Sequence, residues 1–285
     1  MSGEIAFANT ALESFAALVT FVLLFACIAK IKMQRGIKHV TSKEAKRNTL
    51  DYILIICLVI HMIVLTADVL SWMAMDFGKN EVWLLFMLNL TFTCLSLECM
   101  VYTYYVKETI YQHEKIGNTY VYLVMLSTVI AIILWITSDI SGKFYYLDTQ
   151  GNYTQGSIFW LCQFYCIIVM CGNIVILLKH RKALVRHDVL SLLMYGLIPI
   201  ASIPAQMLWK STTFNLATTL VLIYICISVH MAQYDRIVEQ EKILIQQEHE
   251  LSMNQMQMMI AFFASFGSLL QSCASAVSEL YRKCG

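Results

Sequence analysis

Four polar side chains whose types and spacing could do chemistry lie inside otherwise apolar segments of this 285-residue chain. His61 and Asp68 are seven residues apart in one segment, and Thr91 and Glu98 are seven residues apart in the next. A spacing of seven puts both members of a pair on one face of a helix. An imidazole beside a carboxylate can bind or pass on a proton, and such groups are costly to bury in lipid. These four residues are therefore the candidate site for ligand binding or proton sensing.

The turn between the two segments, residues 77–81, is short, so the segments should form neighbouring antiparallel helices. Counted inward from this turn, His61 lies at the depth of Glu98, and Asp68 lies at the depth of Thr91. The sequence thus predicts two contacts between the helices, His61 with Glu98 and Asp68 with Thr91. Either these contacts only hold the helices together, or they form the sensing site.

Long apolar segments must position these residues. The chain is 59% hydrophobic and 14% charged, whereas a soluble domain has about 25% charged residues. Because a helix satisfies its own backbone groups in lipid, we expect an all-α membrane protein, a seven-transmembrane helix bundle in contact with the lipid bilayer. The basic residues lie in loops and the net charge is +1, so no nucleic-acid partner is expected. The segments lie at about 9–31, 52–76, 82–106, 118–138, 157–178, 188–209 and 213–231.

The charges of the loops predict the orientation. Glu4 and Glu13 precede the core of the first segment and Lys30, Lys32 and Arg35 follow it, the reverse of a cleavable signal peptide. Three alternate loops carry six, two and four basic residues, twelve in all. The loops on the other side carry one each: Lys79, Lys143 and Lys210. The positive-inside rule therefore predicts an N-terminus outside, a cytoplasmic C-terminus and a multi-pass protein of the inner (plasma) membrane.

Five tryptophans lie near the predicted outer ends of the segments: Trp72, Trp83, Trp135, Trp160 and Trp209. Amphipathic rings prefer the boundary between lipid and water. The tryptophans form either a one-sided interfacial belt or an aromatic rim around an outward-facing ligand mouth.

The longest predicted outer loop, residues 139–157, contains two short aromatic runs around a Thr-Gln-Gly-Asn turn. This pattern predicts a small β-hairpin that lies over the bundle. The hairpin either caps a pocket or only connects two helices.

The ten cysteines are better explained as free thiols than as disulfides. Eight of them lie inside apolar segments, where we expect them to be buried, and none lies in a predicted outer loop. The chain has no phosphate-binding glycine loop, no metalloprotease motif and no lysine in the seventh segment for a retinal Schiff base. We therefore expect no cofactor, no metal and no catalytic residue.

Beyond the seventh segment, residues 232–259 form a charged, glutamine-rich helix that continues the last apolar segment. An apolar stripe recurs every seven positions in it: Ile237, Leu244, Leu251 and Met258. This repeat is typical of a coiled-coil seam, and polar residues at the alternate core positions make it a weak seam. A marginal seam would suit a switch between registers; the alternative is a solvated single helix.

These features together resemble the membrane-sensor half of certain bacterial sensor histidine kinases. In those proteins the rod leads into a dimerisation helix with a Pro-His-Phe-x-x-Asn box and a later Ala-x-Ser-Glu-Leu-like run. Here residues 255–260, QMQMMI, and 276–280, AVSEL, fit the flanks, but residues 267–272 read GSLLQS. Ser268 stands at the phosphoacceptor position, and no histidine follows His249. Residues 260–285 therefore resemble a truncated or degenerate dimerisation helix.

The resemblance implies a two-component signal-input module with a sensor domain at 1–231 and a signalling helix at 232–259. The chain has no room for an ATP-binding domain of more than about 100 residues, so it is not expected to be a kinase by itself. Its implied partners are a second copy or an intact kinase, with a response regulator downstream. The alternatives are a transporter or channel subunit, whose polar residues would line a permeation path, and a non-functional fragment. Residues 256–277 are either an amphipathic or dimer-buried helix or an eighth span.

Overall fold

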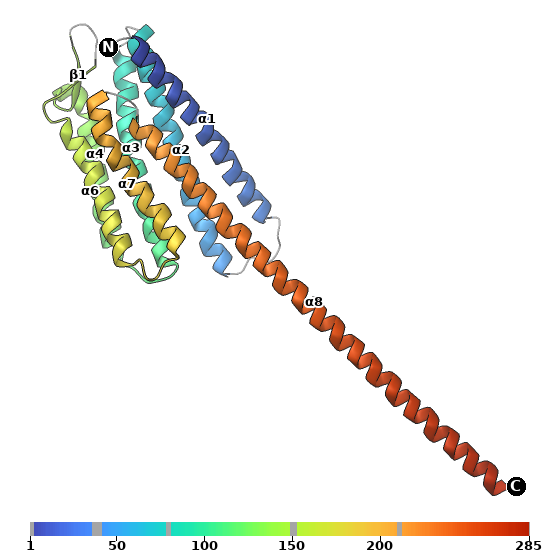
Figure 1. The fold of residues 1–285 in the computed structure, drawn as a ribbon. Helices are drawn as coiled ribbons and strands as arrows, with labels where there is room; N and C mark the ends of the chain where they lie inside the picture. The colour runs from blue at the N-terminus through green and yellow to red at the C-terminus, as the bar shows by residue number, and fades with distance from the viewer. Residues whose placement is uncertain (1–2, 36–41, 78–80, 149–152, 210–212, 285) are drawn as a thin grey trace. The chain divides into compact units, whose positions relative to one another are not determined.

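The computed structural model describes residues 3–35, 42–77, 81–148, 153–209 and 213–284. The fold is all-α apart from one small hairpin, as predicted (Figure 1). The chain divides into two compact units, Met1–Ser228 and Val229–Gly285. The helices are α1 (Gly3–Arg35), α2 (Ser42–Phe77), α3 (Glu81–Tyr111), α4 (Thr119–Ile136), the short α5 (Ser138–Ser141), α6 (Trp160–Lys179), α7 (Arg186–Trp209) and α8 (Thr213–Cys284).

Several of these helices have the length and composition of membrane spans. About 20 apolar residues cross the hydrocarbon core of a bilayer. Within the described residues, four helices are long and apolar enough: Phe7–Lys32, Thr49–Ala74, Glu81–Tyr111 and Thr119–Ile136. Shorter apolar stretches occur at Phe164–Lys179 and Phe214–Ser228. The membrane character of the chain is thus supported, while the number of seven spans stays a prediction.

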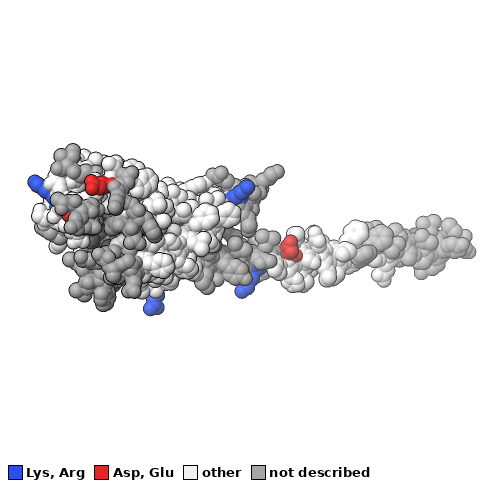
Figure 2. Space-filling view, turned by 90° about the horizontal axis from the view of Figure 1, so that it is seen from above, with Lys and Arg blue, Asp and Glu red and all other residues white. Residues whose placement is uncertain are grey.

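Large apolar side chains cover the outside of the first unit. Phe7, Phe15 and Phe25 of α1 and Leu126 of α4 are each at least 60% exposed. On the face shown in Figure 2, charged side chains are few among the described residues. Such a surface is unfavourable in water but is the surface that a lipid bilayer solvates. The exposed apolar faces of α1 and α4 are thus typical of a membrane protein.

The order of packing places α2 and α3 at the centre of the first unit. Helix α2 packs against α1 and α3, α3 also packs against α4 and α6, and α6 packs against α7 (Figure 1). Hydroxyl groups inside these helices are satisfied locally. Thr20, Thr103 and Thr128 donate to the carbonyl oxygens four residues earlier, at 2.7–2.9 Å. This local bond satisfies the hydroxyl hydrogen of a polar residue in apolar surroundings.

The predicted hairpin is confirmed. Strands β1 (Tyr145–Leu147) and β2 (Tyr153–Gln155) pair antiparallel, with Tyr146 opposite Thr154. The predicted turn, 149–152, lies outside the described residues. Ser138 fixes the hairpin to the end of α4, because its Oγ bonds to both the backbone N and O of Tyr145 at 3.1 Å.

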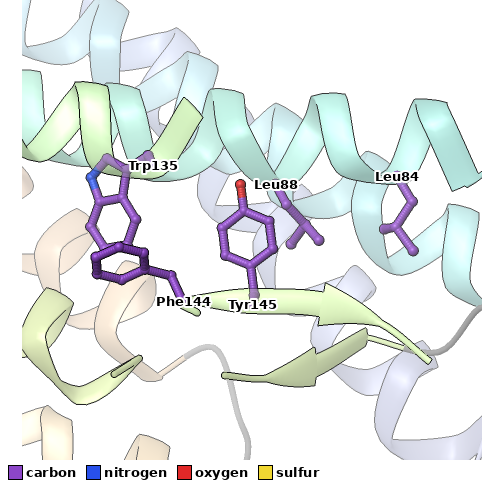
Figure 3. Close-up of a cluster of buried hydrophobic side chains, with 5 residues drawn as sticks. All are labelled: Leu84, Leu88, Trp135, Phe144 and Tyr145. Atoms are coloured by element: carbon purple, nitrogen blue, oxygen red, sulfur yellow. The ribbon is translucent and has the colours of Figure 1, made fainter. Parts of the chain in front are cut away.

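The hairpin lies on a cluster of buried hydrophobic side chains. Figure 3 draws its five residues: Leu84, Leu88, Trp135, Phe144 and Tyr145. The rings of Trp135 and Phe144 meet edge to face at 5.2 Å. Trp135 Nε1 donates to Ser96 Oγ at 3.0 Å, and the Tyr145 hydroxyl donates to Asn89 Oδ1. Trp135 is only 4% exposed. Its assignment to an interfacial belt or a ligand rim is therefore wrong, because Ser96 satisfies its N–H and the hairpin covers its ring.

Of the other four tryptophans, Trp72 and Trp83 have described side chains. Trp72 is half-buried, and Trp83 is 44% exposed and lies 6.1 Å from the ring of Phe86. The side chains of Trp160 and Trp209 lie outside the described residues. An interfacial role for Trp83 stays a prediction.

Seven cysteines have described side chains, and none of these seven forms a disulfide. Six are buried, as predicted: Cys27, Cys57, Cys94, Cys99, Cys166 and Cys226. Cys171 of α6 is exposed, so its predicted burial is wrong. Apolar residues occur on all sides of α6. The periodicity of its sequence therefore does not distinguish the buried face from the exposed face.

Close packing of α4 against α6 depends on a glycine. A Cβ at Gly172 would lie 2.3 Å from Tyr120 Oη, which donates to the Val169 carbonyl at 3.0 Å. We expect Gly172→Ala to lower the free energy of unfolding by about 1–3 kcal/mol, since overpacking displaces the tyrosine. Thermal unfolding in detergent measures this loss. Gly117→Ala is the control, because nothing lies within 4 Å of its Cβ. Equal stability of the two variants would contradict the predicted clash.

Helix α8 runs without interruption from the last apolar segment into the charged segment, as predicted. Residues 256–277 also lie within it, and an eighth span there stays a prediction. Leu251 and Met258 of the proposed seam are 61% and 66% exposed in the single chain. The side chains of Ile237 and Leu244 lie outside the described residues.

Candidate functional site

A histidine and a glutamate form a buried pair between α2 and α3. His61 Nδ1 lies 3.1 Å from Oε1 and 3.2 Å from Oε2 of Glu98. Their side chains are 1% and 3% exposed. The predicted contact between these two residues is confirmed, because the short turn between α2 and α3 fixes their relative depth.

Helix α7 completes the surroundings of Glu98. The Tyr195 hydroxyl donates to Glu98 Oε1 at 2.7 Å and lies 3.8 Å from the Cys57 sulfur. Tyr102 of α3 stacks on Tyr195 at 4.0 Å and donates to the carbonyl of Leu192 at 2.6 Å. Both oxygens of Glu98 are thus engaged by protein groups.

His61 also reaches the last helix. Its Nε2 lies 2.8 Å from Oγ1 of Thr219 in α8. Thr219 Oγ1 in turn donates to the backbone carbonyl of Asn215 at 2.9 Å. One imidazole therefore connects the Glu98 carboxylate of α3 to the backbone of α8.

The hydrogens of this connection allow two arrangements. Where Glu98 is ionised it only accepts, so His61 then carries a hydrogen on Nδ1, and the Thr219 hydroxyl has a single hydrogen to donate. When Thr219 donates to the Asn215 carbonyl, Nε2 must also carry a hydrogen and His61 is an imidazolium. When Thr219 turns to donate to Nε2, His61 is neutral and the carbonyl loses this bond. The charge of His61 and the bonding of α8 are coupled.

The second predicted contact, between Asp68 and Thr91, is wrong. Thr91 Oγ1 donates to the Met87 carbonyl of its own helix at 3.0 Å. Asp68 Oδ2 instead accepts from Nδ2 of Asn215 in α8 at 2.8 Å, and the same Nδ2 donates to Glu13 Oε1 at 3.1 Å. The prediction compared depths along α2 and α3 only. It therefore could not include Asn215 of α8, which is the observed partner of Asp68.

Four residues of this network do not appear among the sequence candidates: Glu13, Tyr195, Asn215 and Thr219. Glu13 was read as an acidic flank of the first segment, but it lies inside the apolar span of α1 and is 1% exposed. Asn215 and Thr219 are four residues apart at the start of the last apolar segment. That spacing puts both side chains on one helix face. A polar face in an apolar segment is the feature of the sequence that could have indicated these two residues.

The network has the chemistry of proton binding and transfer more than of metal binding. It has an acidic group at each end, Glu98 at one end and the pair of Glu13 and Asp68 at the other. His61, Thr219 and Asn215 connect the two ends. Among the described residues, no group of three or more His, Cys, Asp or Glu side chains could hold a metal ion. The sequence matches no model of a known protein family and no curated protein.

Proposed function

We propose that the chain is the signal-input module of a membrane signalling protein, with α8 as its output. The observation that supports this function best is the contact of His61 with Thr219, because it joins the buried pair of His61 and Glu98 to α8, the helix that continues into the charged segment. A change in the charge of His61 changes which hydrogen bond Thr219 makes. The two charge states of His61 therefore interact differently with α8. A shift between two states of a protein requires such a difference in interaction free energy.

In this proposal the output is a small displacement of α8 that is passed on to a cytoplasmic partner. The resemblance to sensor histidine kinases suggests an intact kinase as that partner, in a homodimer or heterodimer joined along the Leu251 and Met258 stripe. Both side chains are exposed in the single chain and available for such a seam. The stimulus enters at the buried network or under the hairpin.

The proposed orientation has seven spans, an outer N-terminus and a cytoplasmic α8. The loop charges support it through the positive-inside rule. A single cysteine introduced at Gln247, in a variant without the native cysteines, tests it with a membrane-impermeant reagent. We expect labelling only in inverted vesicles; labelling from the cell exterior would reverse the orientation.

Thr219→Val should change the output without removing the pair of His61 and Glu98. The valine keeps the shape of threonine but loses the hydrogen bond to His61, which is worth about 1.5 kcal/mol. We expect the basal activity of a kinase domain fused after Met259 to change about tenfold or more. Autophosphorylation in membrane vesicles measures it, with fusions at four successive positions to sample the register of the helix.

Thr218→Val is the matched control for this substitution. Thr218 is the neighbouring residue of α8, is also buried, and donates to the Phe214 carbonyl at 3.0 Å. It therefore loses the same local bond but no contact with His61. If both variants leave the activity of every fusion unchanged, the contact of His61 with Thr219 is only structural and the proposed signalling function loses its support.

A proton-coupled transporter is the second candidate, because the polar groups from Glu13 to Glu98 form a nearly continuous chain inside the bundle. Proteoliposomes containing the protein distinguish the two functions. Movement of protons or solute across the membrane that is abolished in folded Glu98→Ala protein would favour transport. Sealed, inactive vesicles would favour the signalling function.

A further inference from the structure

Two carboxyl groups meet inside the bundle where α1, α2 and α8 come together. Glu13 Oε1 of α1 and Asp68 Oδ2 of α2 accept hydrogen bonds from the same nitrogen, the amide Nδ2 of Asn215 in α8, at 3.1 and 2.8 Å. Glu13 is 1% exposed. Carboxylic acids this close in a poorly hydrated place cannot readily both be ionised.

No positive charge balances this carboxyl pair in the part of the chain that the structure describes. The groups that face it are the Asn9 side chain on α1, Ser71 Oγ on α2 at 3.4 Å from Asp68, and the Asn215 amide on α8. The other buried acids are different. Asp51 lies 2.7 Å from Lys30 Nζ, and Glu98 lies beside His61. The charge of the pair must therefore be balanced in another way.

Two buried polar atoms at this place have no hydrogen-bond partner. One is Glu13 Oε2, and the other is Nδ2 of Asn9, which is 3% exposed and lies one helical turn from Glu13 on the same face of α1. Buried polar atoms are almost always hydrogen-bonded, so such a pair of atoms points to a bound species. A hydrogen on Glu13 Oε2 would turn this unsatisfied acceptor into a donor. It would also remove one of the two charges.

We propose that Glu13 and Asp68 form a site that binds one exchangeable proton. A metal ion fits the same place poorly, because the N–H groups of Asn215 point at both carboxyl groups and would repel a cation there. The proton site does not depend on the proposed function of the chain. Loss of the proton at high pH would leave two negative charges in contact, which opposes the packing of α1 against α2 and α8. The contact between these helices should therefore weaken as the pH rises.

Infrared difference spectroscopy of the full-length protein in lipid vesicles tests this site. At neutral pH we expect the carbonyl band of a protonated carboxylic acid, which moves to lower frequency in D2O. The band should be lost in Glu13→Gln and shifted in Asp68→Asn, which removes the neighbouring carboxylate charge. Asp51→Asn is the matched control, because it removes a buried acid that is paired with Lys30, and it should leave the band unchanged.

Measurements on the unmodified protein keep the test valid where a variant does not fold. The acid band should disappear as the pH is raised and return when it is lowered, and the replacement of sodium by choline at constant ionic strength should not affect it. Absence of an acid band at neutral pH would overturn the proposal. So would a band that neither folded variant alters, or a band that depends on sodium, since an alkali ion would then occupy the site. None of these readouts requires signalling activity.

Discussion

Replacement of Glu98 with leucine is expected to lower the free energy of unfolding by about 3–5 kcal/mol, because His61 would remain buried without its charged partner. Tyr195 would lose its acceptor in the same variant. Reversible denaturation in detergent micelles measures the loss. Replacement of both His61 and Glu98 with leucine should recover part of it, since the penalty comes from one uncompensated group rather than from the absence of the pair.

The pair of His180 and Glu114, whose side chains are 14% and 49% exposed, is the control for this experiment. Its nitrogen and oxygen are 2.9 Å apart, but the glutamate side chain is 49% exposed, so water replaces the lost partner. We expect Glu114→Gln to cost no more than about 1 kcal/mol. If Glu98→Leu also cost no more than about 1 kcal/mol, the pair of His61 and Glu98 would be hydrated, which would contradict its buried position in the structure.

Trp135→Ala is expected to cost about 3–5 kcal/mol, the usual loss for a large aromatic residue removed from a core. The change removes a stacked contact with Phe92 at 5.0 Å, an edge-to-face contact with Phe144 and the hydrogen bond to Ser96. Denaturation monitored by circular dichroism measures the effect. The Trp135→Ala substitution should also increase proteolysis of the hairpin, since Tyr145 and Phe144 belong to the same cluster.

Two further substitutions separate the causes of this loss. Trp135→Phe keeps most of the ring contacts, and Ser96 still donates to the Phe92 carbonyl at 3.0 Å, so the cost should be smaller. Trp83→Ala removes a tryptophan that is 44% exposed and should have little effect on stability. If Trp135→Ala were as mild as Trp83→Ala, the cluster under the hairpin would not contribute to the fold.

The parts of the structure that follow from local sequence could be predicted. Apolar segments bounded by charged loops predicted the helices, and a turn between aromatic runs predicted β1 and β2. The contact of His61 with Glu98 followed from the short turn between α2 and α3. Each of these inferences needs only neighbouring segments, whose relative depth the connection itself determines.

The rest depends on which distant helices meet. Asp68 pairs with Asn215, which is 147 residues later, and neither depth nor spacing shows that α8 lies beside α1 and α2. Apolar residues surround the membrane helices, so periodicity does not reveal the buried face. For this reason the burial of Trp135, the exposure of Cys171 and the role of Glu13 were not apparent from their positions in the sequence.

Asn215 belongs to both halves of the polar network. Its backbone carbonyl accepts from Thr219, and its amide donates to Glu13 and Asp68. Thermodynamic linkage is reciprocal, so if occupancy at the carboxyl pair alters the state of the imidazole, the imidazole must alter that occupancy by the same factor. This asparagine is therefore where coupling between the carboxyl pair and the imidazole would originate, and its removal should leave each group to respond on its own.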